Sequence, residues 1–251
     1  IPAMGVSWAL GVTGLGLAML LLAVFLVPIV LLASWGEIPA DRQAGFASLI
    51  LALEAFIVVI FTARDVLLFY LVFEAMLIPV YFLIGRYGGP DRRRAAIKFL
   101  LYSLAGGLVM LIGVVALTVY GPGGDENYLI QNLSQGLTSS TGVTRGIFVT
   151  FLIAFAIKAP MVPLHTWLPD TAAQATPGTS VLLIGVLDKI GTYGMIAIVL
   201  PLFPEASRWA APVILPLAIV GIIYGGLAAI GQDHLYRLIS YTSISHFGFM
   251  V

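Results

Sequence analysis

The feature that most limits how this chain can fold is a series of long apolar runs that carry almost no charge. The run at 20–33, LLLAVFLVPIVLLA, has no charged residue and does not alternate between apolar and polar positions. A membrane-spanning helix needs about 20 mostly apolar residues, whereas strands of a membrane barrel alternate over about ten. The sequence therefore predicts an all-α, polytopic transmembrane helical bundle. Its eight expected spans cover about 14–34, 45–62, 66–84, 96–120, 146–167, 179–200, 211–231, and a segment that begins near 236.

The composition excludes the main alternatives. Hydrophobic residues make up 60% of the 251 residues and charged residues 10%, against roughly 45–50% and 25% in soluble proteins. The 12 basic and 12 acidic side chains balance, so no nucleic-acid surface is expected. Cysteine is absent and there are 3 histidines, so disulfides, iron–sulfur clusters and other metal centres are not expected here. Glycine-rich phosphate loops, catalytic Ser-His-Asp spacing and a dinucleotide fingerprint are also missing.

Arginines in the connecting segments predict the orientation of the bundle. One side of the membrane would carry more of them than the other, and such residues gather on cytoplasmic loops. We therefore expect the side of the run at 92–94 to be cytoplasmic and the long polar loop 121–145 to be outside. We interpret that run as this topological signal rather than as a lipid or partner site. The richer side has Arg42, Arg86, Arg92, Arg93, Arg94 and Arg237, and the other has Arg64, Arg145 and Arg208.

Five titratable residues lie near the centres of predicted spans. At 1.5 Å per residue, each is roughly 12–18 Å deep in a roughly 30 Å apolar core, where one charge costs about 2.5–3.5 kcal/mol. Two acids, two amines and an imidazole at a common depth predict a row of groups that passes protons through water. Other interpretations stay open: a Glu–Lys pair could only join helices, a protonated carboxyl could sit between helices, and serines could satisfy the imidazole. The five are Glu54, Glu74, Lys158, Lys189 and His246.

Two prolines interrupt the span that contains Lys158, which reads FLIAFAIKAPMVPLHTWLPD. Pro160 and Pro163 lack an N–H and push the residues before them out of helical geometry. We expect a proline-broken helix near 158–163, with His165 close to the break and a polar turn, LPDTAAQATPGTS, after it. Irregular backbone beside a buried charge is typical of ion-transport sites, although a simple proline kink remains the alternative.

Asp188 directly precedes Lys189. Adjacent residues on a helix point about 100° apart and do not face each other. Pairing across to another helix is therefore the expectation for Asp188.

Three long motifs resemble the antiporter-like membrane subunits of respiratory complex I, the proton-translocating NADH:quinone oxidoreductase. They read LLFYLVFEAMLIPVYFLIGRYGG, AIKAPMVPLHTWLPD and LLIGVLDKIGTYG, and the terminal HLYRLISYTSISHFGF is similar to the family's next motif. Within the family the chain most resembles the M-type branch. The resemblance is clearest over 65–100 and 150–251.

The resemblance implies a domain organisation. Family members have about fourteen helices with two inverted five-helix repeats. By that pattern, 1–44 would hold the first visible helix and its connecting loop, 45–203 the first repeat with its broken helix at 146–167, and 204–251 the start of the second repeat. The chain begins IPAMGVSW without a basic leader and ends at Val251 in an apolar run. We therefore expect further chain at both ends and no signal peptide.

The resemblance also implies roles for single residues. Glu74 and Lys158 match the family's coupled pair, Lys189 matches its central relay, and His246 lies in its SxSHxG motif. The chain departs from the family in the turn after the broken helix. Ala172 and Gln174 stand there in place of the usual His and Glu, so a histidine-mediated input through this turn is not implied.

Cofactors and partners follow from the same resemblance. No redox centre is expected in this chain, because NADH, FMN, iron–sulfur clusters and quinone would belong to partner subunits. The partners would be L-type and N-type membrane neighbours, through them the peripheral redox arm, and membrane lipids. The location would be the bacterial plasma (inner) membrane. Two alternatives stay open: a subunit of a multisubunit Na⁺/H⁺ antiporter or membrane-bound hydrogenase, and a membrane scaffold whose buried charges only join helices.

Overall fold

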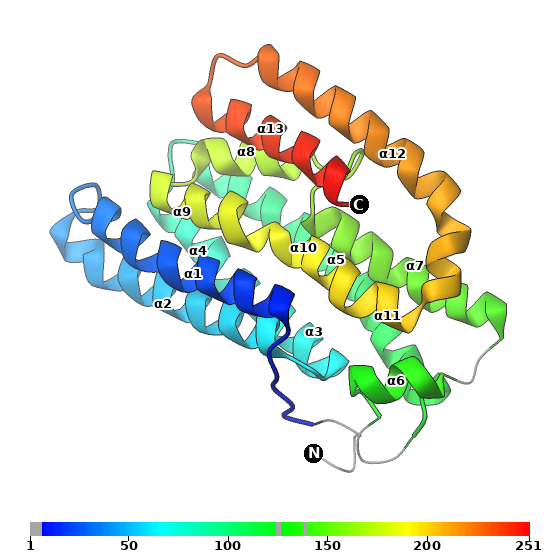
Figure 1. Cartoon of the computed structure of the whole chain (residues 1–251). Helices are drawn as coiled ribbons and strands as arrows, with labels where there is room; N and C mark the ends of the chain where they lie inside the picture. The colour runs from blue at the N-terminus through cyan, green and yellow to red at the C-terminus, as the bar shows by residue number, and fades with distance from the viewer. Residues whose placement is uncertain (1–6, 124–126, 138–139) are drawn as a thin grey trace.

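The computed structural model describes residues 7–123, 127–137 and 140–251, and within these ranges the chain is helical, without an extended strand (Figure 1). Two isolated β-bridges join connecting segments. The helices are α1 (Gly14–Ser34), α2 (Ala40–Thr62), α3 (Val66–Ala75), α4 (Leu77–Tyr87), α5 (Arg92–Tyr120), α6 (Ile130–Gly136), α7 (Thr141–Lys158), α8 (Trp167–Gln174), α9 (Pro177–Leu182), α10 (Lys189–Gly194), α11 (Leu200–Leu202), α12 (Pro204–Ile230) and α13 (Leu235–Met250). The π-helical segments η2 (Leu183–Leu187) and η3 (Met195–Val199) join α9, α10 and α11 into one long rod.

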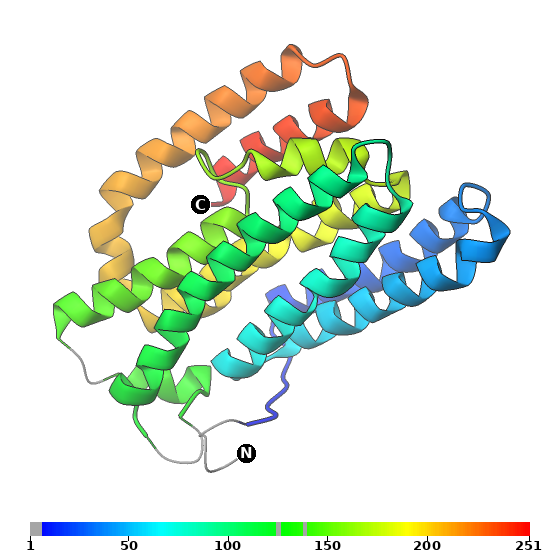
Figure 2. The same cartoon turned by 180° about the vertical axis from the view of Figure 1, so that it is seen from behind.

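The long helices lie side by side in one bundle, and α12 with α13 forms a hairpin along one flank (Figures 1 and 2). The short helix α8 packs against both α5 and α13. It therefore connects the bundle to the hairpin. Among the described residues, 7 helical segments are long and apolar enough to cross a membrane. The predicted all-α transmembrane fold is confirmed.

The helix boundaries follow the predicted spans closely. α1 occupies the predicted range 14–34, and α2, α5 and α12 begin several residues earlier than expected. α13 begins at Leu235, next to the predicted start near 236, and has 16 residues. The predicted span 66–84 is two helices, α3 and α4, separated at Met76. Pro79 explains this break, because it cannot donate a hydrogen bond back to the preceding turn.

Two predicted loops contain helices. The segment after the proline break was expected to be a polar turn, but Trp167–Gln174 forms α8. Its apolar side, with Trp167, Leu168 and Ala172, is fully buried, and this burial outweighs its polar composition. Pro169 is tolerated because the first helical turn has no internal acceptors for its N–H groups. The predicted loop 121–145 likewise contains α6, whose Leu133 is buried.

Side chains cap several helices locally. The Asp65 carboxylate accepts the Leu68 N–H at the start of α3 (2.9 Å) and the Ser7 N–H (2.9 Å). Thr13 accepts the Gly16 N–H at the start of α1 (3.1 Å). Such caps satisfy N–H groups that the first helical turn leaves free.

The outer faces of the helices are apolar. Leu32 is 75% exposed, Val119 72% and Ile230 84%. Exposed apolar side chains distributed along helices long enough to span a bilayer are the lipid-facing surface of a membrane protein. The inward faces carry large apolar side chains such as Phe61 and Phe151, with small residues where two helices approach closely. A Cβ on Gly113 of α5 would overlap Thr150 of α7, so glycine lets these two helices approach closely.

Candidate functional site

The centre of the site is the break after α7, which ends at Lys158. Pro160 and Pro163 have no N–H to continue the helix. The Met161 N–H donates to the Ala156 carbonyl (2.9 Å), five residues earlier rather than the four of an α-helix, so the helix ends in a wider, π-type turn. The predicted break after Lys158 is therefore confirmed. The irregular chain covers 159–166 and lies between α7 and α8, rather than inside one helix that reaches 167.

Trp167 fixes the chain on the far side of the break. Its indole Nε1–H donates to the Ile157 carbonyl (2.9 Å), and its side chain is fully buried. In a continuous helix the Ile157 carbonyl would accept the Met161 N–H, but that N–H donates to Ala156, so the indole satisfies the carbonyl instead. The C-terminal end of a helix carries partial negative charge, and Lys158 is the last residue of α7.

Lys158 is 1% exposed and its ammonium lies among aromatic rings. The Nζ atom is 5.2 Å from the centre of the Phe99 ring and 5.4 Å from that of Phe73. Ring faces of this kind attract a cation by about 0.5–2 kcal/mol. Nζ makes no hydrogen bond or ion pair with any described residue. This amine is therefore buried without a direct polar partner.

Glu74 on α3 contributes the first carboxylate near this amine. It interacts electrostatically with Lys158, but no ion pair joins the two side chains in this structure. Its carboxylate lies directly against Gly107 of α5, where an added Cβ would overlap it. Its Oε1 atom is buried and has no hydrogen-bond partner among the described residues. The two predicted partners, Glu74 and Lys158, are therefore within electrostatic reach of each other but do not form an ion pair.

The rod α9–α11 contributes two further ionisable groups. Lys189 is half-buried, and its Nζ donates to the Ile184 carbonyl in η2 (3.2 Å). Asp188 is fully buried, and neither carboxylate oxygen has a hydrogen-bond partner among the described residues. Asp188 interacts electrostatically with Lys158 and Lys189. The sequence indicated only that Asp188 should pair across to another helix, and the structure identifies the end of α7 as its neighbour.

His165 lies in the break itself. It is 5% exposed, and both ring nitrogens lack a hydrogen-bond partner among the described residues. Its ring packs edge-on against Tyr224 of α12, with centroids 5.0 Å apart, and lies 6.5 Å from the ring of Tyr241 of α13. His165 therefore connects the break to the hairpin rather than to the carboxylates.

The structure does not join Glu54 and His246 to this group. Glu54 on α2 is half-buried and His246 on α13 is exposed. Neither makes a hydrogen bond, ion pair or ring contact with the residues that the structure describes. Their proposed place in the proton path stays a prediction.

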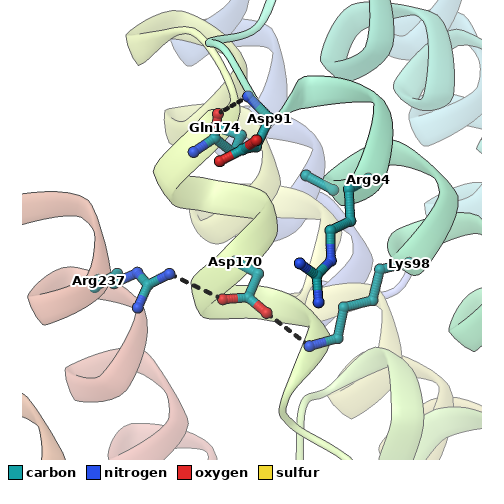
Figure 3. Close-up of a pocket in the computed structure, with 7 residues that line it drawn as sticks. Asp91, Arg94, Lys98, Asp170, Gln174 and Arg237 are labelled. Atoms are coloured by element: carbon teal, nitrogen blue, oxygen red, sulfur yellow. Dashed lines mark hydrogen bonds and ion pairs between the residues drawn. The ribbon is translucent and has the colours of Figure 1, made fainter.

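A second ionisable cluster lies at the end of the bundle that carries the arginine run (Figure 3). The Asp170 carboxylate of α8 accepts from Lys98 Nζ of α5 (2.7 Å) and from Arg237 Nη2 of α13 (3.1 Å). Lys98 also donates to the Thr166 carbonyl (2.8 Å). These three side chains line a cavity of about 360 Å³, and Arg94 points toward it as well. Asp170 therefore bridges the bundle and the hairpin.

Sequence reasoning missed this bridge. Its only signal in the sequence is an acidic residue, Asp170, in the polar segment that follows the broken helix. Gln174, one of the two departures from the family, accepts the Asp91 N–H at the same cavity (3.0 Å). Ala172, the other departure, is fully buried in α8.

Comparison with known proteins gives consistent matches. Residues 63–251 match the family described as "NADH:quinone oxidoreductase/Mrp antiporter, TM". Subunit M of the NADH-quinone oxidoreductase of Mycobacterium tuberculosis is 43% identical over an alignment that covers 100% of this chain and 52% of that protein. Chain 4 2 of the NAD(P)H-quinone oxidoreductase of Thermosynechococcus vestitus is 40% identical and is covered to 46%. The chain thus spans about half the length of these relatives.

Solved structures show the same fold. A chain of respiratory complex I from Thermus thermophilus with bound NADH superposes with a TM-score of 0.85 and 34% identity, over 98% of this chain and 50% of that one. A chain of an archaeal membrane-bound sulfane sulfur reductase superposes with a TM-score of 0.77 and 23% identity, over 96% of this chain and 40% of that one. The latter likeness concerns the fold alone.

Proposed function

Because the chain belongs to the NADH:quinone oxidoreductase/Mrp antiporter family of membrane proteins, we propose that it is a proton-translocating membrane subunit of an NADH:quinone oxidoreductase. The observation that carries the proposal is the buried amine of Lys158, which ends a broken helix and has ionisable neighbours on two other helices. Ionisable groups inside a membrane bundle mark ion or proton paths. Broken helices beside them are typical of transport sites.

The proposed path runs from Glu74 and Lys158 toward Lys189. While a carboxylate is close, it stabilises the positive charge of Lys158, and the amine keeps its proton. When quinone reduction elsewhere in the complex changes the hydration and separation of the pair, that stabilisation is lost and the proton leaves toward Lys189.

The redox chemistry in this proposal belongs to partner subunits. NADH, FMN, iron–sulfur clusters and quinone would be bound there, and this chain would contribute proton movement alone. Its neighbours would be L-type and N-type membrane subunits, its surroundings membrane lipids, and its location the bacterial plasma membrane. In this proposal, 45–203 forms the first five-helix repeat and 204–251 the start of the second. The path would also include His165, Glu54 and His246.

Replacement of Lys158 by methionine tests the proposal. Lys158→Met keeps the length of the side chain and removes its protonatable group. In inverted membrane vesicles the variant should lose most NADH-driven acidification, while a native gel still shows an assembled, NADH-oxidising complex. Arg208→Met, which removes an exposed cation from the start of α12, is the matched control and should pump normally. Normal pumping by Lys158→Met would refute the proposed function.

The family description also names the Mrp antiporter, which makes antiport the second candidate. The same buried groups could exchange Na⁺ for H⁺. Vesicles energised without NADH distinguish the two functions. A ΔpH that responds to added Na⁺ and disappears in Lys158→Met would favour the antiporter.

A further inference from the structure

Asp188 is a buried ionisable group that the proposed path does not use. Its side chain is fully buried, and neither oxygen has a hydrogen-bond partner among the described residues. A buried carboxylate without hydrogen bonds is costly unless a nearby charge compensates it. The neighbouring charges therefore decide what Asp188 does.

The packing of α10 on α7 determines which charges those are. A Cβ on Gly191 would lie 2.6 Å from the Ala159 nitrogen and 2.7 Å from the Phe155 carbonyl. The backbone of α10 therefore touches the last turn of α7, and only glycine allows this approach. Asp188 precedes Gly191 by three residues and so lies on the same face of the rod. That face meets the end of α7, where Lys158 is.

Lys158 consequently has carboxylates on two different helices. Glu74 comes from α3, which packs on α7 through contacts of Phe69 and Phe73 with the Phe155 ring. Asp188 comes from the junction between η2 and α10, and it also interacts electrostatically with Lys158. Around Lys158 the described charged and titratable groups are these two acids, Lys189, and Tyr70, which interacts electrostatically with Glu74. The Phe73 and Phe99 rings beside the ammonium carry no charge.

Asp188 and Lys189 are adjacent in sequence but project in directions about 100° apart. The Lys189 ammonium turns back to the Ile184 carbonyl of η2 (3.2 Å), while Asp188 faces α7. The π-helical segment η2 directly precedes the two residues, and such segments often occur at functional sites because they re-aim side chains. The Asp188 carboxylate therefore faces Lys158, whereas the Lys189 ammonium points away from it.

We propose that Asp188 is a second carboxylate partner of Lys158 and the group through which the proton passes from Lys158 to Lys189. In the first step the Lys158 ammonium gives a proton to the Asp188 carboxylate, leaving a neutral amine and a neutral acid. In the second step the acid gives that proton to the neutral amine of Lys189, which restores the carboxylate and forms an ammonium. No electron moves in either step. The inference rests on the proposed function and adds one residue to its path.

The test uses the whole complex in inverted vesicles and compares Asp188→Asn with Asp188→Glu. Asparagine keeps the shape of the side chain but cannot carry the proton. The rate of acidification per NADH oxidised should fall about fivefold in Asp188→Asn, a change typical for loss of one electrostatic interaction between neighbouring groups. Asp188→Glu should recover most of that ratio. Because the ratio is normalised to NADH oxidation, poorer assembly alone does not change it.

A double-variant cycle separates the two carboxylates. Glu74→Gln alone should retain part of the proton movement, because Asp188 still receives the proton of Lys158. The combination of Glu74→Gln with Asp188→Asn should lose more than the product of the two single effects. Independent effects would show that the two acids do not share Lys158 and would overturn the inference.

Failure of this inference and failure of the proposed function give different results. If Asp188→Asn keeps the parent ratio while Lys158→Met loses it, Asp188 is not in the path and the proposed function stands. If Lys158→Met also keeps the ratio, the proposed function itself fails. If Asp188→Asn assembles only together with Lys158→Met, then Asp188 only balances buried charge, and its role as a proton carrier is overturned.

Discussion

The two ionisable clusters of this protein use the same residue types in opposite ways. At the break after α7, Lys158 and Asp188 are fully buried and make no direct ion pair. At the end of the bundle, Lys98 and Asp170 form an ion pair of 2.7 Å with side chains 29% and 43% exposed. The first cluster holds charges where they are costly, and the second holds them where water screens them.

This difference indicates different roles. A paired charge in a partly exposed position contributes modest stability and fixes helices relative to one another. An unpaired ionisable group in the interior has no such structural benefit, and its protonation depends strongly on what moves near it. We therefore expect changes at the buried cluster to alter proton movement, and changes at the exposed cluster to alter stability. Lys158→Met should have the largest effect of all.

After Lys158→Met, we expect the next largest effect on proton movement from Gly107→Ala, which changes the buried cluster without removing an ionisable group. The new Cβ would overlap the Glu74 carboxylate, so the flexible side chain of Glu74 must turn away. Acidification per NADH should fall about fivefold, as it would on weakening the electrostatic interaction between Glu74 and Lys158. Gly106→Ala is the control, because its Cβ would lie 3.2 Å from Ile157 Cδ1 and no closer than 3.5 Å to any other atom. Equal loss in both glycine variants would contradict this explanation.

Trp167→Phe tests whether the break must be held in place. Phenylalanine keeps the aromatic packing but removes the N–H that reaches the Ile157 carbonyl (2.9 Å). A buried acceptor left without its donor lowers the free energy of unfolding by about 1–3 kcal/mol. Thermal unfolding of the purified complex measures this change. Trp209→Phe, at a tryptophan that is 48% exposed, should leave the midpoint unchanged, and a similar decrease there would count against a specific role for the break.

Asp170→Asn should give the smallest effect. It removes both ion pairs of α8, whose partner side chains on α5 and α13 are 29% and 46% exposed. Screened pairs of this kind contribute about 1 kcal/mol or less. The unfolding midpoint should fall slightly at low salt and converge with the parent at high salt, while acidification per NADH stays near the parent value. Glu205→Gln, which breaks an exposed pair with Arg208, is the control. A large loss of acidification in Asp170→Asn would contradict the expectation that the exposed cluster affects stability and only the buried cluster affects proton movement.

Much of the fold could be predicted because the membrane imposes simple rules on the sequence. A bilayer core requires long apolar helices, so hydropathy located the spans, with α1 at its predicted residues. The helix break after Lys158 was predictable as well, because proline chemistry acts locally. The helix α8 was not, because a short segment with Thr, Gln and Asp becomes helical here through burial of Trp167 and Leu168 against other helices.

The sequence by itself determined that several ionisable residues lie deep in the membrane and that α7 must end beside one of them. It could not determine which of these residues meet. That depends on how far each helix is rotated and how closely it approaches its neighbours, and here glycines set both: Gly107 makes room for Glu74, and Gly191 brings Asp188 to the end of α7. Depth in a membrane is a property of position along the chain, whereas contact between helices is a property of their packing. The tertiary structure alone therefore decided that Lys158 has two acids within electrostatic reach.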